Sequence, residues 1–356
     1  MSEEKDPMSE GDAGRRYRVV QWATGNVGSR SLRVVIEHPH MDLVGLFVHS
    51  ADKVGRDAGE LCGLGPVGIK ATNRVDDIVA LTPDCVIYMQ QGFNADDVCR
   101  LLAAGINVVT TRDEVQYAEA MAPALRARIE EACRQGGTSI HATGSSPGFI
   151  NEAVPLVLLS LQRRLDAVTI DEFADLSSRN SPELLFNIMG FGAKISSLDE
   201  GRLNYLKHSV EPSLRLIADA IGMPLEGVEA KGEVGLARDD TPIAAGVVKK
   251  GTVAATRIVI SGMRSGRPLL TQRFNWFCGT NIDQPWGLRE SGWRLLVEGD
   301  TPLDVTFRFP VPPELYAETT PGLTAHRAVN AVPFVCEAPP GLRSTLDLPY
   351  IVPAFS

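Results

Sequence analysis

A glycine turn near the N-terminus carries the residue types best suited to holding a phosphate group. From Tyr17 the chain is rich in β-branched and aromatic residues as far as the turn, and apolar positions then recur at helical spacing. In such a strand–turn–helix unit, glycine lets the backbone approach a pyrophosphate, and the helix N-terminus presents N–H groups and a positive dipole end. We therefore expect a dinucleotide to be bound by Thr24, Gly25, Asn26, Val27 and Gly28.

The usual fingerprint of such turns is G-x-G-x-x-G, and this chain matches only part of it. Ala23 stands at the position of the first glycine, whereas Gly25 and Gly28 stand at the other two. Taken alone, the motif is explained equally well by an ordinary strand-to-helix turn in an α/β protein. The dinucleotide site therefore needs support from other parts of the chain.

The end of the next predicted strand bears on which dinucleotide is bound. Sites for NAD commonly place an Asp or Glu about 20 residues beyond the glycines, where it bonds the ribose 2′-hydroxyl. Here the strand of residues 42–48 is followed by polar and basic residues, namely His49, Ser50, Lys53 and Arg56. These groups suit a 2′-phosphate, so we expect NADP to be preferred, with NAD as the second choice. The alternative is that Lys53 and Arg56 are solvated loop charges.

A carboxylate follows the end of another predicted strand. Glu114 comes shortly after residues 106–111, and in a parallel sheet the carboxyl ends of the strands form the edge where ligands bind. A carboxylate there could accept a proton from an ammonium group or from attacking water. The simpler interpretation is an acid in the first turn of the following helix, where it favours the helix dipole. Ser145 lies in the loop after residues 139–143, and we expect it to contact the cofactor.

Aromatic residues could supply an apolar pocket for a small amine. We expect its walls to include Phe149, Phe173 and Trp276, with Trp286 and Trp293 as further candidates. Aromatic side chains more often belong to the plain core, which is the alternative for each of them. Glu172 could face the same pocket, although a dimer or solvent contact would explain it equally well.

The helices and strands that must position these residues follow a different pattern in the first part of the chain than in the second. Between residues 17 and 150, predicted strands alternate with predicted helices, which indicates a Rossmann-like, doubly wound parallel sheet. From residue 151 the pattern indicates an α+β domain with a mostly antiparallel or mixed sheet. We expect a disordered tail at 1–16, a dinucleotide-binding domain at 17–150, a substrate-binding and dimerisation domain at 151–322, and a C-terminal segment at 323–356 that returns to the first domain.

Three local predictions rest on periodicity or turn residues alone. An apolar stripe predicts a helix of roughly four to five turns that runs from Tyr117 to Cys133. Residues 243–249 read as one strand, and residues 323–331 read as a helix.

The composition excludes several classes of protein. The chain has 356 residues and a formal net charge of −9, which argues against a nucleic-acid-binding protein or a basic membrane-surface protein. No stretch of membrane-spanning length is free of charge, and residues 1–16 do not read as a signal peptide, so we expect a cytoplasmic protein. The six cysteines are scattered without a C-x-x-C pair, and we assign no metal site.

Five segments together resemble one known family. They are WATGNVG at 22–28, TTRDE at 110–114, HATGSSPGF at 141–149, FADLSSRNSPELLFNIMGFG at 173–192 and TAHRAVNAVPFV at 324–335. The chain resembles the 2,4-diaminopentanoate dehydrogenase-like family of native amine dehydrogenases, within the wider dihydrodipicolinate reductase-like group. The resemblance implies NAD(P)-dependent interconversion of an amine and a ketone in a homodimer, and it assigns the family's acid/base glutamate to Glu114.

On these grounds we expect an NADP-preferring amine dehydrogenase. It would aminate ketones or aldehydes reductively with ammonia and would deaminate primary amines in the reverse direction. Two alternatives stay open, an NADP-dependent carbonyl or imine reductase and a catalytically silent NADP(H)-binding regulator. The role of Glu114 distinguishes an amine dehydrogenase from these two alternatives. A regulator would not need the carboxylate, and a simple ketone reductase would be expected to use Tyr, Lys or His as its proton donor.

Overall fold

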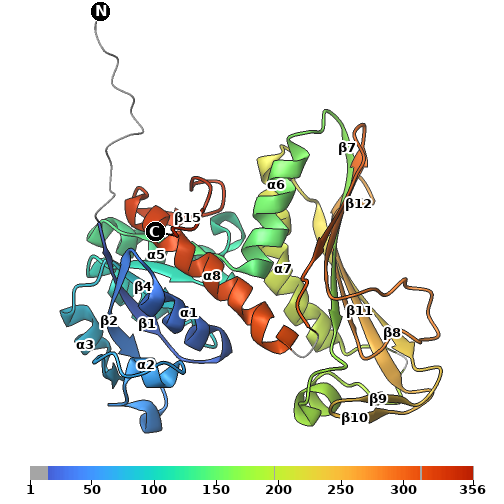
Figure 1. Ribbon diagram of the computed structural model, residues 1–356. Coiled ribbons are helices and arrows are strands. Elements are labelled where there is room, and N and C mark those ends of the chain that lie inside the picture. The colour runs from blue at the N-terminus through green and yellow to red at the C-terminus, as the bar shows by residue number, and fades with distance from the viewer. Residues whose placement is uncertain (1–14, 196, 313–314, 356) are drawn as a thin grey trace, which may run out of the picture. The chain divides into compact units, whose positions relative to one another are not determined.

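The computed structural model describes residues 15–195, 197–312 and 315–355, and it divides into two compact units (Figure 1). Unit 1 comprises the described residues up to Arg112 together with Ala122–Ala142 and the stretch from Thr324 onward, and unit 2 comprises Asp113–Met121 and Thr143–Leu323. The predicted fold class is confirmed, since unit 1 holds a parallel Rossmann-like sheet and unit 2 holds a mixed sheet with helices.

Unit 1 is built on a seven-stranded parallel sheet with strand order β15-β6-β5-β4-β1-β2-β3. Its strands are β1 (Tyr17–Trp22), β2 (Met41–Phe47), β3 (Ala71–Thr72), β4 (Cys85–Tyr88), β5 (Asn107–Thr110), β6 (Ser139–Ala142) and β15 (Gly341–Arg343). Its helices are α1 (Asn26–Glu37), α2 (Ala58–Leu61), α3 (Val75–Ala80), α4 (Ala95–Ala103) and α5 (Pro123–Gly136), with the short 3-10 helix η1 (Ala51–Lys53). The central strands read as apolar runs because helices cover both faces of such a sheet.

The C-terminal helix is longer than predicted. Helix α8 spans Tyr316–Glu337, so it begins in unit 2 and ends in unit 1. Its second half contributes buried Val329, Val332 and Val335 to the core that contains Val19 of β1 and Ile87 of β4. After α8 the chain enters the sheet of unit 1, where β15 pairs in parallel with β6.

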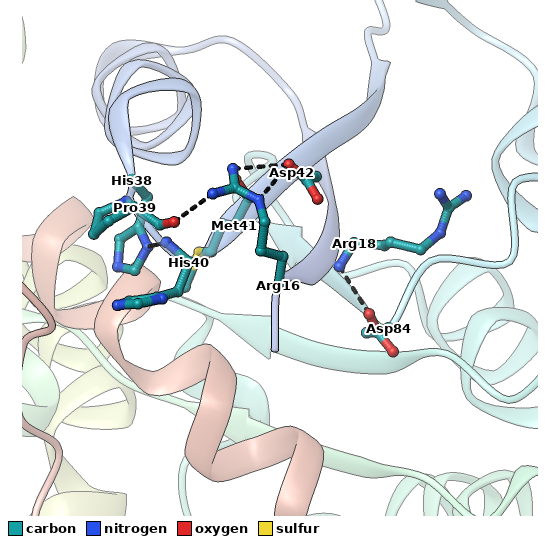
Figure 2. Close-up of polar contacts among 8 residues, drawn as sticks. All are labelled: Arg16, Arg18, His38, Pro39, His40, Met41, Asp42 and Asp84. Atoms are coloured by element: carbon teal, nitrogen blue, oxygen red, sulfur yellow. Dashed lines mark hydrogen bonds and ion pairs between the residues drawn. The ribbon is translucent and has the colours of Figure 1, made fainter. Parts of the chain in front are cut away.

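The chain is fixed to the sheet from Arg16 onward (Figure 2). The predicted tail lies outside the described residues as far as residue 14. The Arg16 guanidinium donates to Asp42 Oδ1 (2.8 Å) and to the main-chain oxygen of Met41 (2.7 Å). Arg18 N donates to Asp84 Oδ2 at 2.7 Å, which ties the start of β1 to the chain just before β4. Arg16 therefore belongs to the folded unit rather than to a tail.

The long helix predicted from Tyr117 begins only at Pro123. Two 3-10 helices, η2 (Asp113–Val115) and η3 (Ala118–Ala120), precede it, and Met121 and Ala122 have ψ values of 155° and 127°, outside the helical region. A proline ring clashes with a helical conformation of the residue before it, but at the first helical position it loses only an N–H that would be unpaired there. The prediction that Tyr117 and Met121 lie on this helix is therefore wrong.

Unit 2 is built on a six-stranded mixed sheet with strand order β14-β13-β7-β12-β11-β8. Its strands are β7 (Leu165–Asp175), β8 (Gly227–Leu236), β11 (Val253–Arg264), β12 (Arg267–Phe277), β13 (Gly292–Gly299) and β14 (Leu303–Arg308). Its helices are α6 (Val154–Leu159) and α7 (Glu200–Ala220), with the π-type turns η4 (Ser145–Ala153) and η5 (Glu183–Ile188). Figure 1 shows α6 and α7 on one face of this sheet.

Helix α7 is an element that the sequence analysis does not predict. The Asp199 side chain caps its N-terminus by accepting a hydrogen bond from Arg202 N. One apolar stripe of the helix, which includes Val210, Leu214 and Ile217, is buried against the sheet. Pro212 lies inside the helix, and a proline at such a position normally signals a break in a helical pattern.

The predicted single strand of residues 243–249 is wrong. It is a hairpin of β9 (Thr241–Ile243) and β10 (Gly246–Val248), because the chain reverses at Ala244 and Ala245. Across the part of the chain that the structure describes, no helix is both long enough and apolar enough to cross a membrane.

Candidate functional site

The glycine turn of unit 1 has a backbone that few residues permit. Ala23, at the position of the first fingerprint glycine, has φ of +72°, in the left-handed region that favours glycine. A Cβ on Gly28 would lie 2.4 Å from the Ala23 carbonyl oxygen, so α1 packs this close to β1 because residue 28 is glycine. Buried Gln21 braces the turn, since its Nε2 donates to the same carbonyl oxygen (3.0 Å) and its Oε1 accepts from Ser31 Oγ (2.7 Å). The chain thus keeps the geometry of the fingerprint with alanine at its first position.

The N-terminus of α1 can receive an anion. Among the described residues no side chain caps this helix at Gly25, and its first turn holds no acid. The first N–H groups of a helix have no acceptor within the helix. A Cβ on Gly25 would meet no described atom within 4 Å, so the turn is open on that side. These features fit a pyrophosphate, which would accept from the N–H groups.

Lys53 is the basic residue after β2 that the structure brings to the turn. Its Nζ donates to Thr24 Oγ1 at 3.0 Å. His49 Nε2 lies 2.7 Å from Gln90 Oε1, and Ser50 and Arg56 are exposed. The preference for NADP stays a prediction.

Gln90, which follows β4, is a residue of this region that the sequence analysis misses. Its Oε1 accepts from Trp22 Nε1 (2.8 Å) and lies 2.7 Å from His49 Nε2, so it joins the ends of β1, β2 and β4. Only the strand order, in which β1 lies between β2 and β4, brings these three side chains together. No local sequence signal could have identified it.

Glu114 lies in unit 2, on the 3-10 helix η2, and its side chain is exposed. Because α5 begins at Pro123, Glu114 is not in the first turn of that helix. The simpler interpretation of this residue, an acid that favours the dipole of the following helix, therefore does not apply.

The segment that carries Glu114 is anchored by a buried polar network. Gln116 Nε2 donates to Glu152 Oε1 (2.7 Å), and the same oxygen accepts from Ser213 Oγ of α7 (2.6 Å). All three side chains are buried. Tyr117 Oη adds a bond to Asp219 Oδ2 at 2.8 Å. Buried networks of paired polar groups hold their members rigidly, so the backbone next to Glu114 is fixed to unit 2.

Unit 2 also contains a cavity of about 370 Å³ beside the end of β7, the end of β12 and the start of β13. Its charged lining residues are Glu172, Asp175 and Arg179. Its aromatic lining residues are Phe173, Trp276, Trp293, Phe309 and Tyr316. A mostly apolar cavity with a few polar groups is typical of a small-molecule site.

Strand register explains why Glu172 lies between two indoles. Trp293 of β13 is the direct cross-strand partner of Glu172 in β7, and Trp276 of β12 pairs with the position two residues further along β7. Trp276 Nε1 donates to Glu172 Oε1 (3.1 Å), and Trp293 Nε1 donates to Glu172 Oε2 (3.4 Å). Burial raises the pKa of Glu172, while the two indole N–H groups lower it by a smaller amount. The side chain keeps part of its accessible surface, because it faces the cavity.

Only some of the other predicted site residues of unit 2 line the cavity. Phe173 and Trp276 line the cavity, and so does Ser145, which the sequence analysis assigns to the cofactor. Phe149 instead packs against Trp293, with ring centroids 6.3 Å apart. The roles assigned to these residues stay predictions. Within the described ranges, no three His, Cys, Asp or Glu side chains are grouped so that they could hold a metal ion.

Two family models match this chain. Residues 207–355 match the 2,4-diaminopentanoate dehydrogenase C-terminal domain, and residues 19–111 match the dihydrodipicolinate reductase N-terminus. The second match covers β1, the glycine turn and the strands as far as β5. The first begins within α7 and covers the strand-rich part of unit 2 and the C-terminus.

Known proteins resemble the chain over most of its length. An amine dehydrogenase of Streptomyces virginiae is 29% identical over 351 residues, which cover 93% of this chain and 95% of that protein. A 2,4-diaminopentanoate dehydrogenase of Acetoanaerobium sticklandii is 22% identical over 288 residues, which cover 78% of this chain and 75% of that protein. The solved structure of an amine dehydrogenase from Mycobacterium smegmatis superposes with a TM-score of 0.71 at 18% identity and covers 94% of this chain and 97% of that chain. That likeness shows a shared fold.

Proposed function

Because this chain belongs to the 2,4-diaminopentanoate dehydrogenase-like family, we propose that it is an NAD(P)-dependent amine dehydrogenase. It would aminate ketones or aldehydes reductively with ammonia and would deaminate primary amines oxidatively. The observation that carries the proposal is the end-to-end similarity to an amine dehydrogenase, over 93% of this chain. The glycine turn of unit 1 and the carboxylates of unit 2 are consistent with that reaction.

The residues of the turn fit a dinucleotide. The N–H groups at the start of α1 would hold the pyrophosphate, and the side of Gly25 on which a Cβ would meet no described atom leaves room for it. When bound, the nicotinamide would supply or accept the hydride at the imine carbon. Lys53, fixed beside Thr24, would place a positive charge near the adenosine ribose.

The proposed acid and base is Glu114. Ammonia that adds to a carbonyl carbon must lose one proton to give the carbinolamine, and the carbinolamine hydroxyl must gain a proton to leave as water, which forms the iminium ion. A carboxylate can accept and return these protons, and its negative charge stabilises the developing cation. The network of Gln116, Glu152 and Ser213 would hold Glu114 in one place during turnover.

The test of this function is the dependence of NADPH or NADH oxidation on ammonium. The purified protein would be assayed with a panel of short aliphatic and cyclic ketones, with and without ammonium chloride. We expect oxidation only when ketone and ammonium are both present. Ketone reduction at the same rate without ammonium would make the protein a carbonyl reductase, and cofactor binding without turnover of any ketone would make it a regulator.

The proposed preference for NADP is tested by Ser50→Asp. A carboxylate at the end of β2 would repel a 2′-phosphate but could bond a 2′-hydroxyl. We expect the variant to lose affinity for NADPH and to gain relative efficiency with NADH. Ser50→Asn, which has a similar shape without the charge, is the control. A ratio of NADPH to NADH efficiency that stays at the parent value in Ser50→Asp would contradict the assignment.

We further propose that the protein is a homodimer. Helices α6 and α7 cover one face of the unit 2 sheet (Figure 1). Strand alternation places on the opposite face the ion pairs of Arg273 with the buried Asp171 (2.8 Å) and of Arg294 with Asp304 (2.6 Å). Burial of this face against the same face of a second subunit would complete the sandwich. Sedimentation at micromolar concentration should give the dimer mass, and a fully active monomer would contradict the proposal.

A further inference from the structure

The surroundings of one carboxyl group in the unit 2 cavity act on its charge in opposite directions. Each oxygen of Glu172 accepts a hydrogen bond from one indole, Trp276 Nε1 at 3.1 Å and Trp293 Nε1 at 3.4 Å. Indole N–H groups only donate, so they stabilise the ionised carboxylate. Burial has the larger effect and raises the pKa of Glu172. This carboxyl group therefore keeps its proton to a higher pH than an exposed glutamate does, and the indoles stabilise the anion that remains once the proton leaves.

Other charged or titratable groups lie around Glu172. They are Asp175 at the end of β7, Arg179 after it, Tyr316 of α8, and Arg202 of α7, whose guanidinium lies over the Trp276 ring. Asp175 Oδ1 accepts from both the N–H and the hydroxyl of Ser177. The Tyr316 hydroxyl lies 3.1 Å from two main-chain oxygens. Among the described residues each Glu172 oxygen accepts only from its indole, so this carboxyl group can still bond a ligand in the cavity.

The rest of the cavity suits a small ketone. Its wall is largely aromatic, and the rings of Trp293 and Phe309 meet at 89° with centroids 4.8 Å apart. Such an apolar wall favours the alkyl groups of a ketone, whereas the few polar groups orient its oxygen. Ser145, in the loop that follows the end of β6, also lines the cavity, and α/β proteins bind ligands at loops of this kind. A ketone here would lie beside Glu172 and beside a residue that we expect to contact the cofactor.

We propose that Glu172 donates the proton with which water leaves the carbinolamine. The carbon–oxygen bond of the carbinolamine breaks as its oxygen takes the carboxyl proton, and the nitrogen lone pair forms the carbon–nitrogen double bond of the iminium ion. Glu172 is left as a carboxylate beside that cation, which it stabilises, and a proton from solvent restores it for the next turnover. The inference rests on the proposed reaction but not on Glu114, which is not among the described residues that line the cavity.

The first test follows the proton without turnover. Tryptophan fluorescence of the cofactor-free protein would be recorded from mildly acidic to mildly alkaline pH. Because Trp276 and Trp293 bond the carboxyl group directly, its ionisation should change their emission, with a midpoint above the usual range of a glutamate. Glu172→Gln should lack this transition. A parent protein without the transition, or a variant that keeps it, would overturn the inference whatever the turnover assays show.

Turnover is the second test. The parent and Glu172→Gln would be assayed with a short ketone, ammonium chloride and NADPH or NADH. Glutamine has nearly the same shape but no acidic proton, so kcat should fall by about 10²- to 10⁴-fold while cofactor affinity is retained. Glu298→Gln, which removes an exposed acid from β13, is the control and should stay within a few-fold of the parent. A kcat of Glu172→Gln near the parent value would overturn the inference.

The pH dependence of kcat separates a proton donor from a structural residue. A donor must be protonated, so kcat of the parent should fall as the pH rises through the pKa of Glu172. Trp276→Phe removes an N–H that stabilises the anion, so this pKa should rise and the fall in kcat should move to higher pH. The control is Trp286→Phe, because the Trp286 ring lies against Arg257 and is not part of the cavity lining. It should keep the parent profile.

The outcomes distinguish this inference from the proposed function. A parent that turns over ketone and ammonium, with a pH profile that Trp276→Phe leaves in place, would overturn the role of Glu172 alone. A parent without ammonium-dependent turnover would overturn the proposed function and, with it, the donor role. The fluorescence transition would then still show whether Glu172 keeps its proton above the usual range of a glutamate.

Discussion

Replacement of Glu114 by glutamine is expected to lower kcat for ammonium-dependent ketone reduction by about 10²- to 10⁴-fold, the usual contribution of general acid–base catalysis. Glutamine keeps nearly the same shape but cannot accept the proton that ammonia must lose. The side chain is exposed on the short helix η2, so the substitution should leave folding intact. NADPH affinity should also be retained, because the glycine turn belongs to unit 1. The measurement is NADPH oxidation with a short ketone and ammonium, alongside NADPH binding by fluorescence.

Glu119→Gln is the matched control for this experiment. Glu119 is an exposed acid on η3, the next 3-10 turn of the same segment, so it tests whether loss of any surface charge there matters. We expect its rate to stay within a few-fold of the parent. If Glu114→Gln behaves in the same way, Glu114 is a surface acid and the catalytic carboxylate lies elsewhere.

In unit 1, the sequence predicts those features whose defining residues all lie in one contiguous segment. The strand, turn and helix around Gly25 are contiguous, so their residue types and spacing are sufficient to predict these three elements, whereas phosphate binding at the turn stays a prediction. The partial match to the fingerprint also has a structural explanation, since Ala23 adopts the left-handed conformation that glycine normally supplies. The role of Gln90 could not be predicted, because it depends on strands that are distant in sequence and adjacent in the sheet.

The site in unit 2 was predicted less completely for the same reason. Phe173 and Trp276 are predicted as wall residues, and both line the cavity, whereas the sequence leaves Glu172 open between the pocket and a dimer or solvent contact. Only the register of β7 between β12 and β13 shows that two indoles reach its carboxylate. A one-residue shift in that register would turn Glu172 to the opposite face of the sheet, and the pairing involves β12 and β13, which are distant from β7 in sequence.

Replacement of Gly25 by valine is the other change with a large expected effect, namely loss of both NADPH and NADH binding. At Gly25 φ is −73°, a value that valine can adopt, and a Cβ there would meet no described atom within 4 Å. The added side chain would therefore occupy the space that the proposal assigns to the pyrophosphate. The fold should be weakened only modestly, by about 1 kcal/mol, since valine is a poorer N-cap residue than glycine.

Gly28→Ala provides the contrast that makes this prediction specific. Its Cβ would lie 2.4 Å from the Ala23 carbonyl oxygen, so α1 must shift away from β1 and the protein should lose stability before any ligand is considered. Thermal unfolding and cofactor fluorescence, measured on both variants, should show a melting temperature near the parent value without binding for Gly25→Val, and a lowered melting temperature for Gly28→Ala. A Gly25→Val protein that binds NADPH with the affinity of the parent would show that the phosphates are held elsewhere, because a valine side chain and a pyrophosphate cannot share the same space.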